Sequence, residues 1–359
     1  MKHAHAKAPG KLYIAGEYAV TEPGHPAVIV AVDRFITVSL SPSSNVYGTI
    51  CSPQLSSKTL KWKRLGHDLF LEEPIEKTTI LLKTIEVTEH FLREKGVTLP
   101  YYDITIKSSL DSKDGRKYGL GSSGAVTVAT ILALLESVEY SLDDEGIFKL
   151  AAIIHTQLHS RGSLGDLAAA TYTGWIAYYS VDKSWVKEKL ADANLISLLE
   201  CSWPELKIER LPSPKTLKLI VGWTGIPAST ETYVKSIEQD REELNYQDFL
   251  LQSKKCVTDL IVGLKTNDTQ QVFDSIRYNR ELLLEMSHAK EIVIETPLLQ
   301  TLTRIALKYG AASKTSGAGG GDCGIALVNS SVQENEILSE WRASTIEPLS
   351  LAVYDKSNL

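Results

Sequence analysis

The 359-residue sequence has few cysteines and no long apolar run. Its four cysteines, Cys51, Cys201, Cys256 and Cys323, lie far apart, with no Cys-x-x-Cys pair and no histidine cluster beside them. This spacing argues against a zinc site or a disulfide framework and favours reduced thiols. The longest apolar stretch, residues 125–135, is about half the length that a membrane-spanning helix requires. The N-terminal region has no apolar signal core, so we expect a cytoplasmic protein that does not enter a membrane.

Positive charge is not in excess either, since 38 Lys and Arg stand against 44 Asp and Glu. Nucleic acids and anionic membranes favour a basic surface, so we expect neither as a partner. A hydrophobic fraction of 43% is ordinary for a globular protein. The length suits two domains, which we expect at residues 1–205 and 206–359. Three prolines within residues 202–215 are typical of a connection between them.

Apolar periodicity predicts strands and helices in mixed order. The expected strands are residues 27–32, 35–40, 101–107, 175–179, 217–222, 325–328 and 349–354. The expected helices are residues 76–95, 125–137, 143–160, 167–172, several within 230–309, and 332–343. Strands mixed with helices in a non-repeating order predict two α+β domains and not one doubly wound sheet.

Residues 118–124, Tyr-Gly-Leu-Gly-Ser-Ser-Gly, form a first glycine segment that runs directly into an apolar helical pattern. Free backbone N–H groups and the positive end of the helix dipole would meet there, which suits a phosphate. The two hydroxyls can contact phosphate oxygens or magnesium. The segment lacks the lysine of a Walker loop and does not match a dinucleotide fingerprint. A tight turn with a helix cap is the alternative interpretation.

Residues 314–321, Lys-Thr-Ser-Gly-Ala-Gly-Gly-Gly, form a second glycine segment. Its small residues cannot form a stable helix or strand, and ordering them costs conformational entropy. Such a segment is typical of places where backbone must approach another group closely. A flexible hinge is the alternative.

Taken with residues 8–20, Ala-Pro-Gly-Lys-Leu-Tyr-Ile-Ala-Gly-Glu-Tyr-Ala-Val, these segments resemble the three signature motifs of the GHMP kinases. That superfamily includes galactokinase, homoserine kinase, mevalonate kinase and phosphomevalonate kinase. The resemblance implies an α+β GHMP kinase fold. Its N-terminal domain would be like the second domain of ribosomal protein S5, and its C-terminal domain would be ferredoxin-like. The active site would lie in the cleft between the domains, with ATP and Mg²⁺ as cofactors.

Within the superfamily, the sequence is most similar to the bacterial and fungal phosphomevalonate kinases. Residues 16–18 read Gly-Glu-Tyr where mevalonate kinases tend to read Gly-Glu-His. Similar stretches also occur at residues 115–124, 162–169, 294–297 and 316–324. The implied reaction transfers a phosphoryl group from ATP to (R)-5-phosphomevalonate, a small-molecule substrate, and gives 5-diphosphomevalonate on the route to isopentenyl diphosphate. Mevalonate kinase, another GHMP small-molecule kinase and a non-catalytic ligand sensor are the alternatives, and a monomer and a homodimer are both open.

The resemblance also implies roles for individual residues. Lys11 would stabilise the transferred phosphoryl group or lower the pKa of the attacking oxygen, and Asp166 would be the catalytic aspartate beside it. The residues expected to bind ATP are Gly119, Leu120, Gly121, Ser122, Ser123 and Gly124, with Ser122 or Ser123 reaching magnesium. The alternatives are a solvated Lys11, and helix N-caps for Asp166 and the serines.

A phosphate acceptor has a second pKa near 6, so its attacking oxygen carries little proton at neutral pH. We therefore hypothesise that Asp166 orients Lys11 and the substrate more than it removes a proton. The acceptor's anionic groups require cations, and the candidates are Arg116, Lys117, His288 and Lys290. Ser163, Ser316, Gly317, Ala318 and Gly319 are also expected to contact substrate or nucleotide. The magnesium-binding glutamate of mevalonate kinases corresponds to His155, which is a poor ligand for a hard cation.

Overall fold

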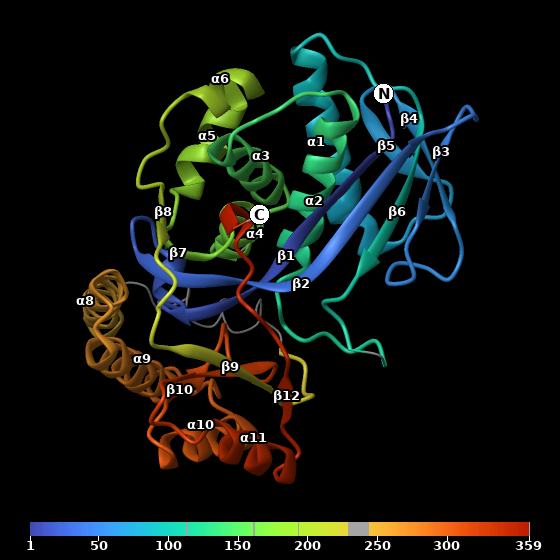
Figure 1. Cartoon of the computed structure of the whole chain (residues 1–359). Coiled ribbons are helices and arrows are strands. Elements are labelled where there is room, and N and C mark those ends of the chain that lie inside the picture. The colour runs from blue at the N-terminus through green and yellow to red at the C-terminus, as the bar shows by residue number, and fades with distance from the viewer. Residues whose placement is uncertain (113, 161, 193, 229–243, 359) are drawn as a thin grey trace.

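The computed structural model describes residues 1–112, 114–160, 162–192, 194–228 and 244–358. Two β-sheets lie one above the other, each with its own helices (Figure 1). The mixed α+β class predicted from the sequence is confirmed. In the described residues, we find no helix both long enough and apolar enough to cross a membrane.

The first sheet has eight strands in the order β5-β4-β3-β6-β2-β7-β8, and β1 pairs with β2 beside this path. The strands are β1 (Ala4–Ala15), β2 (Pro26–Pro42), β3 (Gly48–Cys51), β4 (Leu60–Leu65), β5 (Asp68–Leu71), β6 (Tyr102–Ser108), β7 (Trp175–Tyr179) and β8 (Lys207–Leu211). The predicted strands at 27–32 and 35–40 are two parts of β2. They are separated by a register shift opposite Pro9 and Gly10, where the polar Asp33 and Arg34 interrupt the apolar pattern.

Helices pack on this sheet and enclose the main core. They are α1 (Thr79–Glu94), α2 (Ser122–Ser137), α3 (Asp144–Gln157), α4 (Gly165–Tyr172), α5 (Lys183–Asp192) and α6 (Leu195–Glu200), with short 3-10 turns η1 (Ala19–Thr21) and η2 (Glu76–Thr78). α2 contacts β1, β2, α1, α3 and α4. Because it has neighbours on nearly every side, its sequence is apolar all round and lacks a polar face.

The second sheet has the order β10-β11-β9-β12, and every pair in it is antiparallel. Its elements are β9 (Lys218–Trp223), α8 (Leu244–Thr266), α9 (Thr269–Ala289), α10 (Pro297–Lys308), β10 (Ala312–Thr315), β11 (Cys323–Val328), α11 (Glu334–Ala343) and β12 (Glu347–Leu349). The series β9-α10-β10-β11-α11-β12 is the βαββαβ arrangement of a ferredoxin-like domain, with α8 and α9 inserted after β9. The expected ferredoxin-like domain is confirmed.

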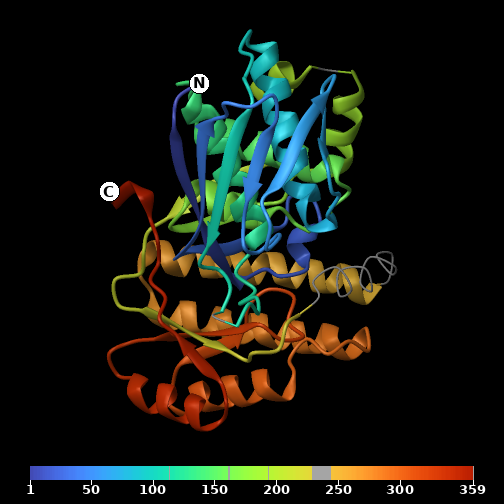
Figure 2. The same ribbon diagram turned by 90° about the vertical axis from the view of Figure 1, so that its right-hand side faces the viewer.

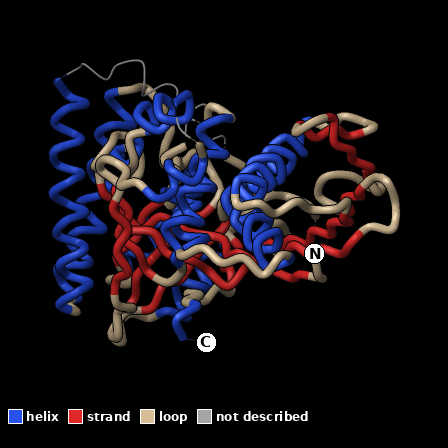
Figure 3. Tube along the Cα trace, turned by 90° about the horizontal axis from the view of Figure 1, so that it is seen from above, coloured by secondary structure: helices blue, strands red, loops and turns tan. Residues whose placement is uncertain are grey.

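The helices of this half lie in two layers. Figure 2 shows α10 and α11 on the face of the second sheet that is turned away from the first sheet. α8 contacts β2 while α9 contacts β10, so this helix pair touches both sheets. Seen from above, α8 runs along one edge of the molecule, and β3 to β5 extend on the opposite side (Figure 3).

The chain crosses between the sheets twice. The expected boundary at 205/206 falls just before β8, which pairs with β7 in the first sheet. We therefore propose a boundary between Leu211 and Lys218, still within the proline-containing connection. The predicted strand at 349–354 is wrong for most of its length, because β12 ends at Leu349. The chain then returns to the first sheet, where Tyr354 N donates to Ala31 O at 2.9 Å, and it ends near α4 in η3 (Lys356–Asn358) (Figure 1).

Candidate active site

The side chain of Lys11 lies against the first glycine segment. β1 runs beside this segment, so Lys11 N donates to Leu120 O at 2.9 Å. Lys11 Nζ donates to Gly119 O at 3.0 Å. The side chain is half-buried, so the structure does not place it as a solvated surface charge.

Asp166, in the first turn of α4, packs against the start of α2. A Cβ added at Gly124 would lie 2.7 Å from Asp166 Oδ2, and one added at Gly121 would lie 3.0 Å from Lys11 Cγ and 3.3 Å from Asp166 Cβ. Gly121 also has a left-handed φ of 78°. Only glycine fits between the lysine, the aspartate and the loop, and the three therefore meet at one place.

The N-caps of α2 and α4 are not the serines and the aspartate that the sequence offered as alternatives. The N-cap of α2 is Gly121, and that of α4 is Leu164. Ser122, Ser123 and Asp166 therefore lie inside the first helical turns and do not hold N-cap positions. α2 also begins at Ser122, earlier than the expected start at 125, so the backbone N–H groups of the serines lie at the positive end of the helix.

Burial and charge perturb the groups around Lys11. Burial lowers the pKa of Lys11, and the carboxylates of Asp166 and Asp322 oppose this shift. Burial also lowers the pKa of His155, again opposed by Asp166. His155 Nε2 lies 3.1 Å from Thr127 Oγ1, a hydrogen bond that a neutral imidazole can make. His155, at the position where the resemblance implies a magnesium-binding glutamate in mevalonate kinases, is thus a buried histidine.

The two residues that directly follow the second glycine segment, Asp322 and Cys323, meet the first segment across the two sheets. A Cβ added at Gly119 would lie 2.4 Å from Asp322 Cγ, so Asp322 directly touches the first segment. Cys323 Sγ donates to Tyr118 O at 3.1 Å. Within the second segment, Ser316 N donates to Cys323 O at 3.0 Å, and Gly320 N donates to Ile294 O at 2.8 Å. These contacts give the segment a defined place in the structure.

Three of the predicted substrate residues lie next to this junction. Ser163 Oγ and Tyr13 OH form a buried hydrogen bond of 2.6 Å, which ties the α4 turn to β1. Arg116 is exposed, pairs with Asp114 at 2.7 Å and donates to Gly225 O at 2.9 Å. Lys117 is exposed, and its charge acts on Asp322.

The other two predicted cations lie at the C-terminal end of α9. His288 is exposed and Lys290 is half-buried. The connection to the junction runs through the following turn, where Ile294 O accepts from Gly320 N. The end of α9, which carries His288 and Lys290, is thus connected to the second glycine segment through Ile294.

Asp322 is a site residue that the sequence reasoning missed. It follows the glycine run directly, which was the available signal, but only the structure shows that its carboxylate touches Gly119. Burial raises the pKa of Asp322, and the N–H of Ala228 and the charges of Lys11 and Lys117 oppose this shift. Two carboxylates thus lie close to Lys11: Asp166, from the half of the chain that carries the first sheet, and Asp322, from the half that carries the second sheet.

The sequence predicts magnesium held by Ser122 or Ser123. Among the described residues, no group of three or more His, Cys, Asp or Glu could hold a metal ion by itself. Magnesium that arrives with ATP needs only one or two protein ligands, because phosphates and water supply the others. The serine hydroxyls and the nearby Asp322 carboxylate are oxygen donors of the kind magnesium prefers, so these residues fit the ion.

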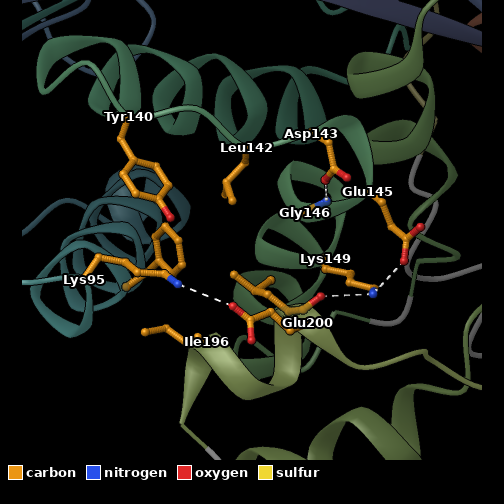
Figure 4. Close-up of a pocket in the computed structure, with 11 residues that line it drawn as sticks. Lys95, Tyr140, Leu142, Asp143, Glu145, Gly146, Lys149, Ile196 and Glu200 are labelled. Atoms are coloured by element: carbon orange, nitrogen blue, oxygen red, sulfur yellow. Dashed lines mark hydrogen bonds and ion pairs between the residues drawn. The ribbon is translucent and has the colours of Figure 1, made fainter.

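A cavity of about 290 Å³ lies apart from this junction, between α1, α3 and α6 (Figure 4). Its charged side chains are engaged with one another and with backbone. Lys149 Nζ pairs with Glu145 at 2.6 Å and donates to Cys201 O at 2.7 Å, while Lys95 pairs with Glu200 at 3.4 Å. These groups hold helices together, and we assign no chemistry to the cavity.

Comparisons with known proteins agree with this geometry. The family model for the GHMP kinases N terminal domain matches residues 81–174, and the model for the GHMP kinases C terminal matches residues 260–346. The chain is 36% identical to the phosphomevalonate kinase of Streptomyces sp. (strain CL190), over 96% of this chain and 95% of that one.

It is similar in structure to a Lin0012 protein from Listeria innocua, with a TM-score of 0.91, 38% identity and 98% of each chain covered. It is also similar to Streptococcus pneumoniae phosphomevalonate kinase in complex with phosphomevalonate and AMPPNP. That match has a TM-score of 0.85 and 30% identity, and covers 98% of this chain and 99% of that one.

Proposed function

The chain belongs to the GHMP kinases, and from this premise we propose that it transfers the γ-phosphoryl group of ATP to (R)-5-phosphomevalonate. The products are ADP and 5-diphosphomevalonate. The observation that carries this proposal is the 36% identity to a phosphomevalonate kinase over 96% of the chain. The first glycine segment, packed against Lys11, Asp166 and Asp322, supports it, as does the similarity to Streptococcus pneumoniae phosphomevalonate kinase in complex with phosphomevalonate and AMPPNP. The cytoplasm is the compartment we propose for this reaction.

Phosphoryl transfer depends mainly on positioning and on neutralising negative charge. In our proposal, residues 119–124 cradle the triphosphate with the backbone N–H groups at the start of α2. Lys11, already hydrogen-bonded to Gly119 O at 3.0 Å, stabilises the transferred phosphoryl group. Magnesium, when bound with ATP, would neutralise phosphate charge, and Ser122 or Ser123, together with Asp322, would hold it.

Asp166 acts in this proposal by orienting Lys11. A phosphate acceptor is largely deprotonated at neutral pH, so removing a proton from it is a minor requirement. Asp166 lies beside the lysine, where its charge opposes the effect of burial and favours the charged form of Lys11. In this proposal, the main role of Asp166 is to orient Lys11 and to keep it positively charged.

The acceptor's own charges would be met by groups at the junction. Lys117 is the best-placed cation, because it is exposed and its charge reaches Asp322. Arg116 would contribute from its place over Trp223, where the guanidinium lies 4.9 Å from the ring centroid. Ser163, Ser316, Gly317, Ala318 and Gly319 would contact substrate or nucleotide, and His288 and Lys290 would approach from the end of α9.

The test is a coupled ADP-release assay with Mg·ATP and either (R)-5-phosphomevalonate or (R)-mevalonate. A site built to hydrogen-bond a substrate group rejects an analogue that lacks the group by about 10⁴-fold in kcat/KM. We expect turnover with phosphomevalonate and a new diphosphate signal by ³¹P NMR. Preference for mevalonate would instead support the mevalonate kinase alternative. Binding of both ligands without turnover would support the non-catalytic sensor.

A further inference from the structure

A buried ion pair joins the two sheets beside the active site. Glu17 follows β1, after a turn at Gly16, and Lys314 lies in β10. Lys314 Nζ contacts Glu17 Oε1, and the two side chains are 0% and 2% exposed respectively. Lys314 Nζ also donates to Thr315 O at 2.7 Å. The mechanism above gives this pair no role, although it connects residues far apart in the sequence.

The same region of the chain holds the second glycine segment directly. Gly317 N donates to Glu17 Oε1 at 3.3 Å, so one carboxylate oxygen accepts from both Lys314 and Gly317. Ser316 Oγ donates to Tyr13 O at 2.9 Å. The Tyr18 hydroxyl donates to Ala318 O. Three consecutive residues, 316 to 318, are thus held from one side by residues 13 to 18.

The second glycine segment needs contacts from outside itself, because its glycines leave the backbone with many accessible conformations. Gly317, Gly319 and Gly320 have left-handed φ angles of 85°, 72° and 74°. Glycine has the largest backbone freedom of any residue, so a defined shape must come from contacts with the surroundings. A rigid placement matters where backbone is to meet a ligand, because misplacement weakens binding.

Stability alone gives a poor reason for burying this pair. Removing two charges from water is expensive, and apolar replacements of buried ion pairs are often as stable as the pair itself. An ion pair has a property that apolar contacts lack, since it specifies which atoms meet. Here the carboxylate that receives Lys314 also receives the amide of Gly317, so the pair fixes the glycine backbone relative to β1, the strand that carries Lys11.

We propose that Glu17 is a positioning residue: with Lys314, it holds residues 316–318 in the shape that receives the anionic ligand. The kinetic consequence rests on the proposed function, whereas the placement of the segment does not. Lys11, Asp166 and the first glycine segment have contacts with one another, including Lys11 Nζ to Gly119 O at 3.0 Å, so loss of the pair should leave them in place. Binding is then weakened before chemistry, which appears as a higher KM with a smaller change in kcat.

The test compares three variants with the wild type. Glu17→Gln removes the charge that faces Lys314. The double variant Glu17→Met with Lys314→Met replaces the pair by apolar side chains and so avoids an unpaired buried charge. Glu89→Gln is the matched control. Glu89 is also a buried carboxylate in an ion pair, since it is 4% exposed and pairs with Arg64 at 2.6 Å. It lies on α1, far from the glycine segments in the sequence. Each protein is measured for thermal unfolding, for hydrogen exchange without ligand, and for steady-state KM and kcat.

We expect both Glu17 variants to exchange the amides of residues 316–320 at least about tenfold faster than the wild type. KM for ATP or phosphomevalonate should rise by a similar factor, while kcat stays within about threefold. Glu89→Gln should lower the Tm and leave both the exchange of these amides and KM unchanged. The double variant should recover a Tm near that of the wild type and keep the fast exchange and the raised KM.

A folded double variant with wild-type exchange at residues 316–320 and wild-type KM would overturn the proposal. If Glu17→Gln does not fold, the double variant decides alone. If the wild type shows no turnover with phosphomevalonate, the proposed function fails, and the exchange measurement still decides the role of the pair.

Discussion

Replacing Gly124 with alanine should damage catalysis without unfolding the protein. An added Cβ would lie 2.7 Å from Asp166 Oδ2 and 2.8 Å from its Cγ. Ordinary contact begins at 3.4 Å, so the carboxylate or the start of α2 must shift by about 0.7 Å. A displacement approaching 1 Å at a catalytic group lowers kcat by about 10²-fold. That factor corresponds to about 2.7 kcal/mol of activation free energy.

Stability should change much less than kcat does. Alanine favours a helix over glycine by about 1 kcal/mol, which offsets part of the strain at residue 124. Gly146→Ala is the matched control, because Gly146 is also the third residue of its helix, α3. Its added Cβ would come no closer than 3.1 Å to Asp143 Oδ1.

Steady-state ADP release at saturating substrates, with thermal unfolding measured in parallel, checks both variants. We expect a low kcat with a Tm near the wild-type value for Gly124→Ala, and wild-type kcat for Gly146→Ala. A folded Gly124→Ala protein with wild-type kcat would refute the placement of Asp166 at the reaction centre.

Three further outcomes are expected. Lys11→Ala should lower kcat by about 10³-fold, as for loss of a group that stabilises transition-state charge, with nucleotide binding by calorimetry retained. Asp166→Asn should lower kcat less than Lys11→Ala does at pH 7; a larger loss that high pH restores would show that Asp166 is a general base. Burial lowers the pKa of His155 from 6.5, so the unfolded state binds its proton more readily, and stability is lost as pH falls through and below 6.5. Thermal unfolding of His155→Gln between pH 5 and pH 8 should show a shallower loss than the wild type, and parallel curves would contradict this explanation.

Local patterns predicted most of the described helices and about half of the described strands. The apolar run after Ser123 identified α2, and the alternation at 101–107 identified β6, because both depend on short-range periodicity. The pattern divided β2 in two, since it cannot distinguish a bulge from a break. It also missed β8, because a strand next to prolines looks like a linker until its partner β7 is known.

The final crossing of the chain was also outside the reach of sequence patterns. The apolar residues after Leu349 predicted a strand, and they do pack against the main core. Their place is on the first sheet, beside Ala31, and not in the second. Nothing in an extended apolar stretch specifies which of two sheets it will join, because both offer apolar surfaces.

At the site, the sequence motifs identified the residues of each glycine segment but not the contacts between the two domains. Lys11, Asp166 and the first glycine segment were predicted together, and the structure brings them together. The contact of Asp322 with Gly119 and the pairing of Glu17 with Lys314 were not predicted. Both join residues of different domains, and such contacts follow from how the domains pack and not from local sequence.

We propose that the two glycine segments together enclose the phosphates of nucleotide and acceptor. Hydrogen exchange with and without Mg·AMPPNP plus phosphomevalonate tests this, since these two ligands can bind together without turnover. We expect the amides of residues 119–124 and of residues 316–321 to become protected together, with those of α11 unchanged. Protection of only one segment, or of neither at ligand concentrations that saturate calorimetric binding, would show that the two segments do not enclose the phosphates together.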